Sequence, residues 1–215
     1  MGVAATSSAM EAILSQENGG RRAAVVGYSL GGRVALALAC LHQGSISSLV
    51  LEGASPGISS DDERAKRRAS DDELADEIER RGIEWFVNHW EENPLFASQK
   101  ELPNQAFESQ RRDRLSNSAL GLASSLRAAG AGRMEPLWTD IERLSIPVLI
   151  VVGDKDAKYR ELGEEMSERI PGSTLARVEG AGHCPHLERT GEFAALVERF
   201  LAEHPTVMSV EGSHA

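Results

Sequence analysis

Short apolar runs alternate along the chain with segments in which apolar residues recur at helical spacing. Each apolar run is brief, is bounded by glycine or polar residues and is rich in aliphatic side chains, which is typical of buried strands. We therefore predict strands at 22–26, 46–51, 146–152 and 174–178. The remaining periodic segments predict helices at 8–16, from 34 to 41, at 159–170 and at 192–203. Strands that alternate with helices form βαβ units, so we expect a mostly parallel sheet.

The character of the chain changes between about 58 and 136. A charged stretch that runs to Arg81 is followed by a cluster of aromatic and apolar residues, namely Trp85, Phe86, Trp90, Leu95 and Phe96. Apolar residues then recur at intervals of four, three and four, which predicts one amphipathic helix through Leu115, Ala119, Leu122 and Leu126. We interpret this segment as a helical lid inserted into the core and lying over the sheet, its aromatic residues used mainly for packing. The predicted division is a core of 1–57 and 137–205, a lid of 58–136 and a disordered tail of 206–215.

The first strand leads into a glycine-flanked serine. The pentapeptide Gly27-Tyr28-Ser29-Leu30-Gly31 is a G-x-S-x-G sequence, and a helix rich in small residues follows it. Between a strand and a helix, this sequence forces the serine into a strained turn that exposes its hydroxyl. We expect Gly27 and Gly31 to be glycines because larger side chains would collide across the turn. The backbone N–H of Leu30 would lie at the start of the helix, where it can stabilise negative charge on a reacting oxygen.

Two further candidate catalytic residues follow later strands. The strand at 146–152 ends at Gly153-Asp154-Lys155-Asp156, and the strand at 174–178 is followed by a glycine-rich turn that carries His183. Serine, aspartate and histidine in this order match the α/β-hydrolase fold, in which the three residues meet at the carboxyl edge of the sheet. We predict that His183 accepts the proton of Ser29 and that Asp156 orients the imidazole. Periodicity does not choose between Asp156 and Asp154.

The composition narrows the classes of partner. A net charge of -10 on 215 residues argues against nucleic acid or an anionic membrane as a partner. No apolar run reaches membrane-spanning length, and Cys40 and Cys184 lie far apart, so we expect a reduced, cytoplasmic protein. The run from His183 to His186 lacks further ligands at metal-binding spacing, so we predict no metal. Nothing in the pattern indicates an oligomeric state.

Several motifs together resemble one family. They are GYSLGGRVAL around Ser29, the strand end EGASPG, ERAKR with Asp71 after it, HWEENPLFAS, DAKY and the loop AGHCPHLE. The chain from about Arg22 to Leu201 resembles the 2-succinyl-6-hydroxy-2,4-cyclohexadiene-1-carboxylate synthase family, the MenH enzymes of menaquinone and phylloquinone biosynthesis. The resemblance implies a lyase that eliminates pyruvate from a cyclohexene polycarboxylate, with Ser29 as the base and with no metal or cofactor. It also implies that the substrate is bound by Tyr28, Arg33, Arg67, Trp90 and Arg114.

The arginines also fit such a substrate on physical grounds. Arg33 lies four residues after Ser29, so the two side chains share one face of a helix. A small polycarboxylate is best held by planar, permanently charged side chains, and an elimination that develops negative charge is stabilised by the same cations. Arg67 and Arg114 come from the lid, which would therefore supply part of the site.

The chain departs from this family at its N-terminus. Members carry strands before the serine and an early loop that supplies a second oxyanion amide, and nothing between Met1 and Arg22 resembles either. We expect an exposed sheet edge and an incomplete oxyanion site, as in a truncated chain, a short form completed by a partner chain, or an inactive remnant.

Two other functions stay open at this point. The same triad could hydrolyse carboxylic esters or carbon–carbon bonds through a covalent serine. The fold could also be a non-catalytic scaffold. In a photosynthetic eukaryote the resemblance implies a plastid enzyme rather than a cytoplasmic one.

Overall fold

The computed structural model describes residues 1–19 and 21–206, and its centre is a four-stranded parallel sheet. The strands are β1 (Ala23–Tyr28), β2 (Ile46–Glu52), β3 (Val148–Gly153) and β4 (Thr174–Val178), and they lie side by side in chain order. The predicted α/β fold with a parallel sheet is confirmed. β3 begins two residues later than predicted, because Pro147 has no N–H for the ladder and only its carbonyl takes part, accepting from Leu49 N at 2.9 Å.

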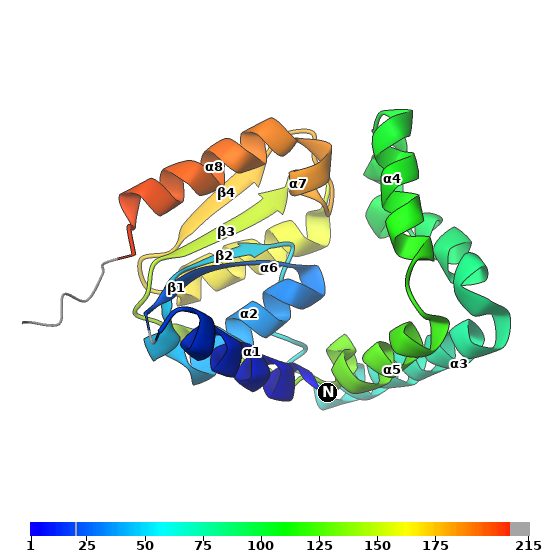
Figure 1. Ribbon diagram of the computed structural model, residues 1–215, viewed down its shortest axis with the longest axis horizontal. Helices are drawn as coiled ribbons and strands as arrows, with labels where there is room; N and C mark the ends of the chain where they lie inside the picture. Colours follow the sequence, from blue (N-terminus) through cyan, green and yellow to red (C-terminus); the bar gives the residue numbers. More distant parts are fainter. Residues whose placement is uncertain (20, 207–215) are drawn as a thin grey trace, which may run out of the picture.

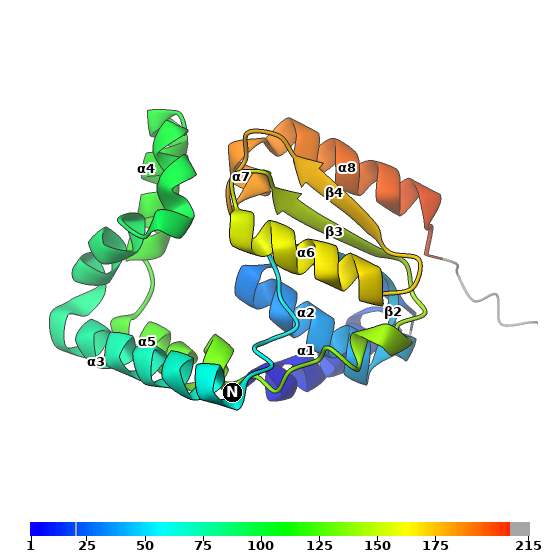
Figure 2. The same cartoon turned by 180° about the vertical axis from the view of Figure 1, so that it is seen from behind.

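Helices cover both faces of this sheet (Figures 1 and 2). One face packs against α2 (Ser29–Leu41) and α6 (Ala157–Arg169), with α1 (Val3–Glu17) outside α2. The other face packs against α8 (Thr190–Glu203), which follows the short α7 (Pro185–Glu188). Right-handed crossovers that advance in one direction along a sheet place their helices on the same face, which accounts for α2 and α6. The short 3-10 segments η1 (Gln43–Ser45) and η4 (Ile141–Arg143) complete the core.

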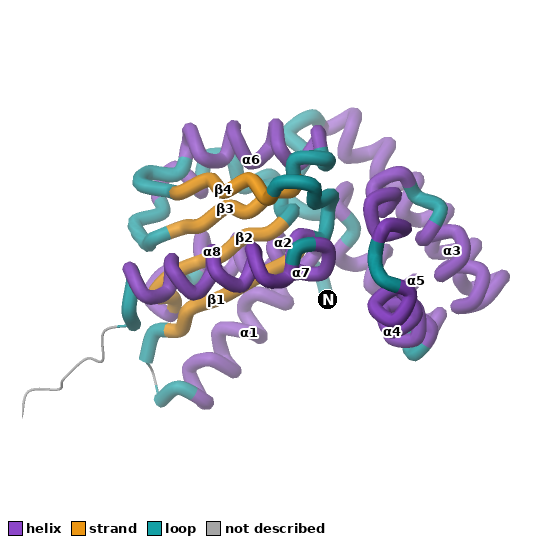
Figure 3. The backbone as a smooth tube through the Cα atoms, turned by 90° about the horizontal axis from the view of Figure 1, so that it is seen from above, coloured by secondary structure: helices purple, strands orange, loops and turns teal. Residues whose placement is uncertain are grey.

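A helical arm, defined here as residues 61–133, leaves the core between β2 and β3. It contains α3 (Asp61–Glu91), η2 (Pro94–Glu101), α4 (Asn104–Leu115), α5 (Ala119–Ala129) and η3 (Ala131–Arg133). The arm has its own apolar cluster, in which Ala75, Ile78 and Ala123 are fully buried. Figures 1 and 3 show the arm beyond the carboxyl ends of the strands, so the expectation that it lies over the sheet is wrong. β2 ends at that edge, and a connection inserted after it leaves the sheet there.

The predicted amphipathic helix through 115–126 is two helices. α4 ends at Leu115 and α5 begins at Ala119. Ser118 caps the second helix, its Oγ accepting from Gly121 N at 3.3 Å. Leu115 and Ala119 still pack into the same apolar cluster, so the apolar spacing was informative although the helix is not continuous.

The free edge of β1 leaves an apolar side chain exposed. Val26 is 51% exposed, on the face that α8 covers at β2 and β3. The described residues before β1 form α1, as predicted for 8–16, and contain no strand. No helix in the described part of the chain is long and apolar enough to cross a membrane. Apart from Thr206, the predicted disordered tail lies outside the described residues.

Candidate active site

Ser29 occupies a strained turn between β1 and α2. Its φ of 48° makes it the only non-glycine residue with a positive φ in 1–19 and 21–206. Such a conformation costs a few kcal/mol at most and persists only where the surrounding packing imposes it. Here it lifts the side chain out at the end of the strand, as the G-x-S-x-G sequence predicts.

Tight packing of two backbones imposes this turn. A Cβ on Gly27 would lie 2.7 Å from the carbonyl oxygen of Gly31, and a Cβ on Gly32 would lie 2.5 Å from Ala54 Cβ. A Cβ on Gly31 would meet nothing within 4 Å. The expectation of a collision at Gly31 is therefore wrong, and Gly32 is the second position where the close approach requires glycine.

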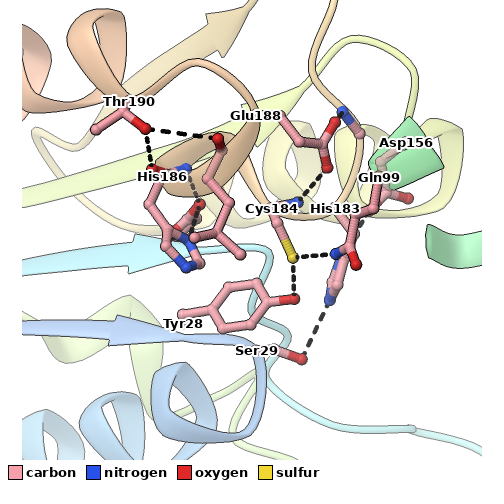
Figure 4. Close-up of polar contacts among 12 residues, drawn as sticks. Tyr28, Ser29, Gln99, Asp156, His183, Cys184, His186, Glu188 and Thr190 are labelled. Atoms are coloured by element: carbon pink, nitrogen blue, oxygen red, sulfur yellow. Dashed lines mark hydrogen bonds and ion pairs between the residues drawn. The ribbon is translucent and has the colours of Figure 1, made fainter. Parts of the chain in front are cut away.

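Ser29, His183 and Asp156 form one chain of hydrogen bonds (Figure 4). His183 Nδ1 lies 2.7 Å from Asp156 Oδ2, and His183 Nε2 lies 3.1 Å from Ser29 Oγ. A carboxylate only accepts, so Nδ1 carries the ring proton and Nε2 is free to accept from the serine hydroxyl. The imidazole is 1% exposed and the aspartate 7% exposed, so bulk water does not compete for these bonds.

Asp154 is not part of this chain. Its backbone N–H donates to the Val178 carbonyl at 3.1 Å, and its buried Oδ1 has no hydrogen-bond partner among the described residues. Asp156 Oδ1, by contrast, accepts from the Tyr159 N–H at 3.2 Å and so caps α6. The geometry thus separates the two carboxylates that periodicity left equivalent.

The loop that carries His183 is fixed by a buried carboxylate that the sequence analysis did not single out. Glu188 is 8% exposed, and its two oxygens accept from Gly182 N at 2.6 Å and Cys184 N at 3.1 Å. Glu52 similarly accepts from the backbone N–H and the Nδ1 of His186 at 2.8 and 2.9 Å. In the described residues no group of three or more His, Cys, Asp or Glu side chains is arranged to hold a metal ion.

Arg33 lies one helical turn after Ser29 and reaches from the core to the arm. Its Nη1 donates to the Ala129 carbonyl at the end of α5 at 3.0 Å. No carboxylate in 1–19 and 21–206 forms an ion pair with it. Burial lowers the pKa of its guanidinium, and the positive charge of Arg67 acts in the same direction.

Arg67 lies farther out, on the wall of a cavity of about 430 Å³. Its Nε donates to Asp71 at 2.8 Å. Tyr159 lines the same cavity, and its ring centroid is 4.4 Å from that of His183, so the Tyr159 ring lies between the cavity and the triad. Burial raises the pKa of the Tyr159 hydroxyl. Tyr159 was missed as a site residue, although it ends the DAKY motif.

Trp90 and Arg114 lie in the arm and reach the triad only through other residues. The Trp90 ring packs at 5.2 Å from Phe86 and at 5.2 Å from Phe96, and Phe96 in turn lies 5.8 Å from the His183 ring. Arg114 Nη2 donates to Gln99 Oε1 at 2.8 Å. The structure therefore places neither predicted substrate-binding residue in direct contact with Ser29 or His183.

Tyr28 and Leu30 flank the serine. The Tyr28 ring lies 5.3 Å from the His183 ring, and its hydroxyl is 2.6 Å from Cys184 Sγ. Burial raises the pKa of this hydroxyl. The Leu30 N–H lies in the first turn of α2, where backbone N–H groups have no partner within the helix, so it is available to an oxyanion.

A family model and curated relatives match this chain. The model, described as the alpha/beta hydrolase family, matches residues 2–196. A Bacillus subtilis (strain 168) protein, provisionally named 2-succinyl-6-hydroxy-2,4-cyclohexadiene-1-carboxylate synthase, is 39% identical over 82% of this chain and 65% of that protein. The synthase of that name from Salmonella schwarzengrund (strain CVM19633) is 33% identical over 76% of this chain and 62% of the relative. The chain thus spans just under two thirds of the length of these relatives.

A solved structure extends the similarity to three dimensions. MenH from S. aureus matches with a TM-score of 0.91 at 36% identity, over 94% of this chain and 76% of that one. Because the match covers so much of the chain, both the core and the arm have counterparts in that structure.

Proposed function

The chain belongs to the alpha/beta hydrolase family and, within it, to the MenH group, and from that premise we propose that it is a pyruvate-eliminating lyase. The proposed substrate is 2-succinyl-5-enolpyruvyl-6-hydroxy-3-cyclohexene-1-carboxylate, and the product is 2-succinyl-6-hydroxy-2,4-cyclohexadiene-1-carboxylate. Both are small polycarboxylates. We further propose that the enzyme works in the cytoplasm and needs no cofactor.

One observation carries this proposal, namely that Arg33 is partly buried close to Ser29 and forms no ion pair with a carboxylate of residues 1–19 and 21–206. The negative charge of Asp71 acts on it only from a longer distance. Such a guanidinium is costly to bury unless an anion completes it. Arg33 is one turn from Ser29 on the same helix, so an anion bound there would place the rest of its molecule at the triad. This arrangement favours a carboxylated substrate over a neutral ester.

The proposed chemistry follows from the hydrogen-bond chain. Ser29 Oγ removes a ring proton while its own proton passes to His183 Nε2, and Asp156 stabilises the imidazolium. The electrons of the broken C–H bond form the new ring double bond, and the bond from the ring to the enolpyruvyl oxygen breaks. Pyruvate leaves as its enolate and takes a proton from the imidazolium. The Leu30 N–H and the cations would stabilise the negative charge.

Release of pyruvate from the proposed substrate tests this function. We expect Ser29→Ala to abolish release, and Arg33→Ala to lower kcat/KM by about 10²-fold, since it removes a charge-assisted contact to the substrate. Arg199→Ala is a matched control, because Arg199 is exposed on α8 and should leave release unchanged. Equal kinetics for the Arg33 and Arg199 variants would contradict the carboxylate role.

Ester hydrolysis through a covalent serine is the second candidate, and the strained turn that holds Ser29 at the end of β1 favours it. A hydrolase should form an adduct with an organophosphonate at Ser29 and turn over a nitrophenyl ester, with little effect of Arg33→Ala. If the folded chain does neither reaction, the non-catalytic scaffold becomes the best account.

A further inference from the structure

A line of hydrogen bonds runs from the arm to the residue before Ser29. Arg114 Nη2 donates to Gln99 Oε1 at 2.8 Å, Gln99 Nε2 donates to Cys184 Sγ at 2.9 Å, and Cys184 Sγ lies 2.6 Å from the Tyr28 hydroxyl. Figure 4 shows the last part of this line, with the Tyr28 hydroxyl and Ser29 Oγ both directed toward His183. The line therefore joins α4 and η2 to the catalytic turn.

The first two bonds of this line have a fixed direction. A guanidinium can only donate, so Arg114 makes the side-chain oxygen of Gln99 the acceptor. The amide NH₂ of Gln99 must then face Cys184, and the sulfur accepts from it. The thiol hydrogen then points away from Gln99. The Tyr28 oxygen lies 2.6 Å from the sulfur, and either atom of that pair can be the donor.

Burial keeps the line intact at neutral pH. Gln99 and Cys184 are each 2% exposed, so water does not replace either bond. Burial also raises the pKa of the Cys184 thiol to about 12, so the thiol retains the hydrogen that it would donate. A line whose members all donate in one direction polarises cooperatively toward its end.

We infer that Gln99 and Cys184 are positioning residues: by making the thiol donate to the Tyr28 oxygen, they leave the Tyr28 hydroxyl hydrogen free to bond an anionic group of the substrate beside Ser29. This inference rests on the proposed function for its substrate. It gives Arg114 an indirect role, because its charge starts the line without touching the triad. It also means that Tyr28 can donate its hydroxyl hydrogen only while the arm packs against the loop that carries His183.

The direction of donation can be measured without any turnover. In a Cys40→Ser background Cys184 is the only thiol, and its S–H stretching band reports whether the thiol donates. We expect Tyr28→Phe to move this band to the higher frequency of a free thiol. An unchanged band would overturn the inference, because it would mean that Tyr28 donates to the sulfur instead.

Near-isosteric variants test the consequence for the reaction. Gln99→Glu keeps the contact with Arg114 but cannot donate to the thiol as a carboxylate, so we expect kcat to fall about 10-fold with a smaller change in KM. Cys184→Ala should cost a similar factor, whereas Cys184→Ser retains a donor and should stay within about threefold of the wild type. Gln105→Glu, at an exposed position of α4, is the matched control for the charge and should have no effect.

The outcomes separate this inference from the proposed function. If the serine and alanine variants of Cys184 are equally impaired, the thiol only fills space and the inference fails while the lyase assignment stands. If the wild-type chain releases no pyruvate, the proposed function fails, and the S–H band still decides the direction of donation.

Discussion

Asp154 and Asp156 lie two residues apart but have different hydrogen-bond partners in this structure. Only Asp156 reaches His183, and asparagine at this position would still cap α6 but would favour the wrong imidazole tautomer. We expect Asp156→Asn to lower kcat by about 10⁴-fold with little loss of stability. Asp154→Asn is the matched control and should keep near wild-type turnover, measured as pyruvate release. Similar losses in both variants would contradict the assignment of Asp156.

Individual residues could be predicted where strand ends bring them together. Ser29, Asp156 and His183 each follow a parallel strand, and the carboxyl ends of parallel strands share one edge. Gln99 had no such signal, because its contact with Cys184 spans 85 positions and depends on how the arm folds back. The roles assigned to the triad and the arginines stay predictions until variants are assayed.

At the scale of single elements, α3 contains a break that helix propensity does not reveal. Gly82 has a φ of 84° and a ψ of 178° within this helix, a conformation that is strained for any residue with a side chain. We expect Gly82→Ala to lower the free energy of unfolding by about 1–3 kcal/mol. Gly121→Ala in α5 is the control, because that glycine is helical and the substitution should raise stability by up to about 1 kcal/mol. Urea unfolding of both variants measures the difference, and equal effects would contradict the strain.

Elements were predicted well where the apolar pattern was strong and short. The strand at 174–178 was located to the residue, because it lies between a glycine and a turn. The pattern failed at 116–118, where regular apolar spacing continues across the gap between two helices, the second of which Ser118 caps. The spacing of apolar residues indicates which residues pack into the same apolar cluster, but those residues can come from two different helices.

At the scale of the whole molecule, two thiols make the free energy of unfolding depend on pH in the alkaline range; Cys184 is buried and Cys40 is half-buried. Burial raises the pKa of Cys40 and of Cys184 to about 12, whereas a thiol in an unfolded chain has a pKa of about 8.5. Below the pKa of the unfolded chain's thiols, both the folded and the unfolded state keep the thiol protons, and the thiols' contribution to the free energy of unfolding does not change with pH. Between about 8.5 and 12 the unfolded chain loses its thiol protons first, so stability falls as the pH rises.

Serine variants isolate this contribution, because serine does not titrate in this range. From about pH 8 to about pH 10 we expect wild type to lose about 2 kcal/mol more stability than Cys40→Ser. The double variant with Cys184→Ser should lose least. If urea unfolding gives the same dependence of the free energy of unfolding on pH for wild type and the variants, the fold does not raise the pKa of these thiols.

The overall architecture followed from the alternation of strands and helices, but the position of the arm did not. The arm begins where β2 ends, so it extends from the carboxyl edge and lies outside the sheet. Composition marked the segment as different without indicating the direction in which it leaves the core. That direction is set by the sheet, and it determines that Arg33 meets the carbonyl of Ala129.

The two oxygens of Asp156 have separate partners, one in the imidazole of His183 and one in the amide of Tyr159. The first turn of α6 and the orientation of the His183 ring therefore depend on the same carboxylate. If that turn frays, the carboxylate rotates and the ring loses its acceptor. The hydrogen bond to His183 therefore depends on an intact first turn of α6. The hydrogen-exchange rate of the Tyr159 amide thus reports the fraction of time for which Ser29, His183 and Asp156 are hydrogen-bonded together.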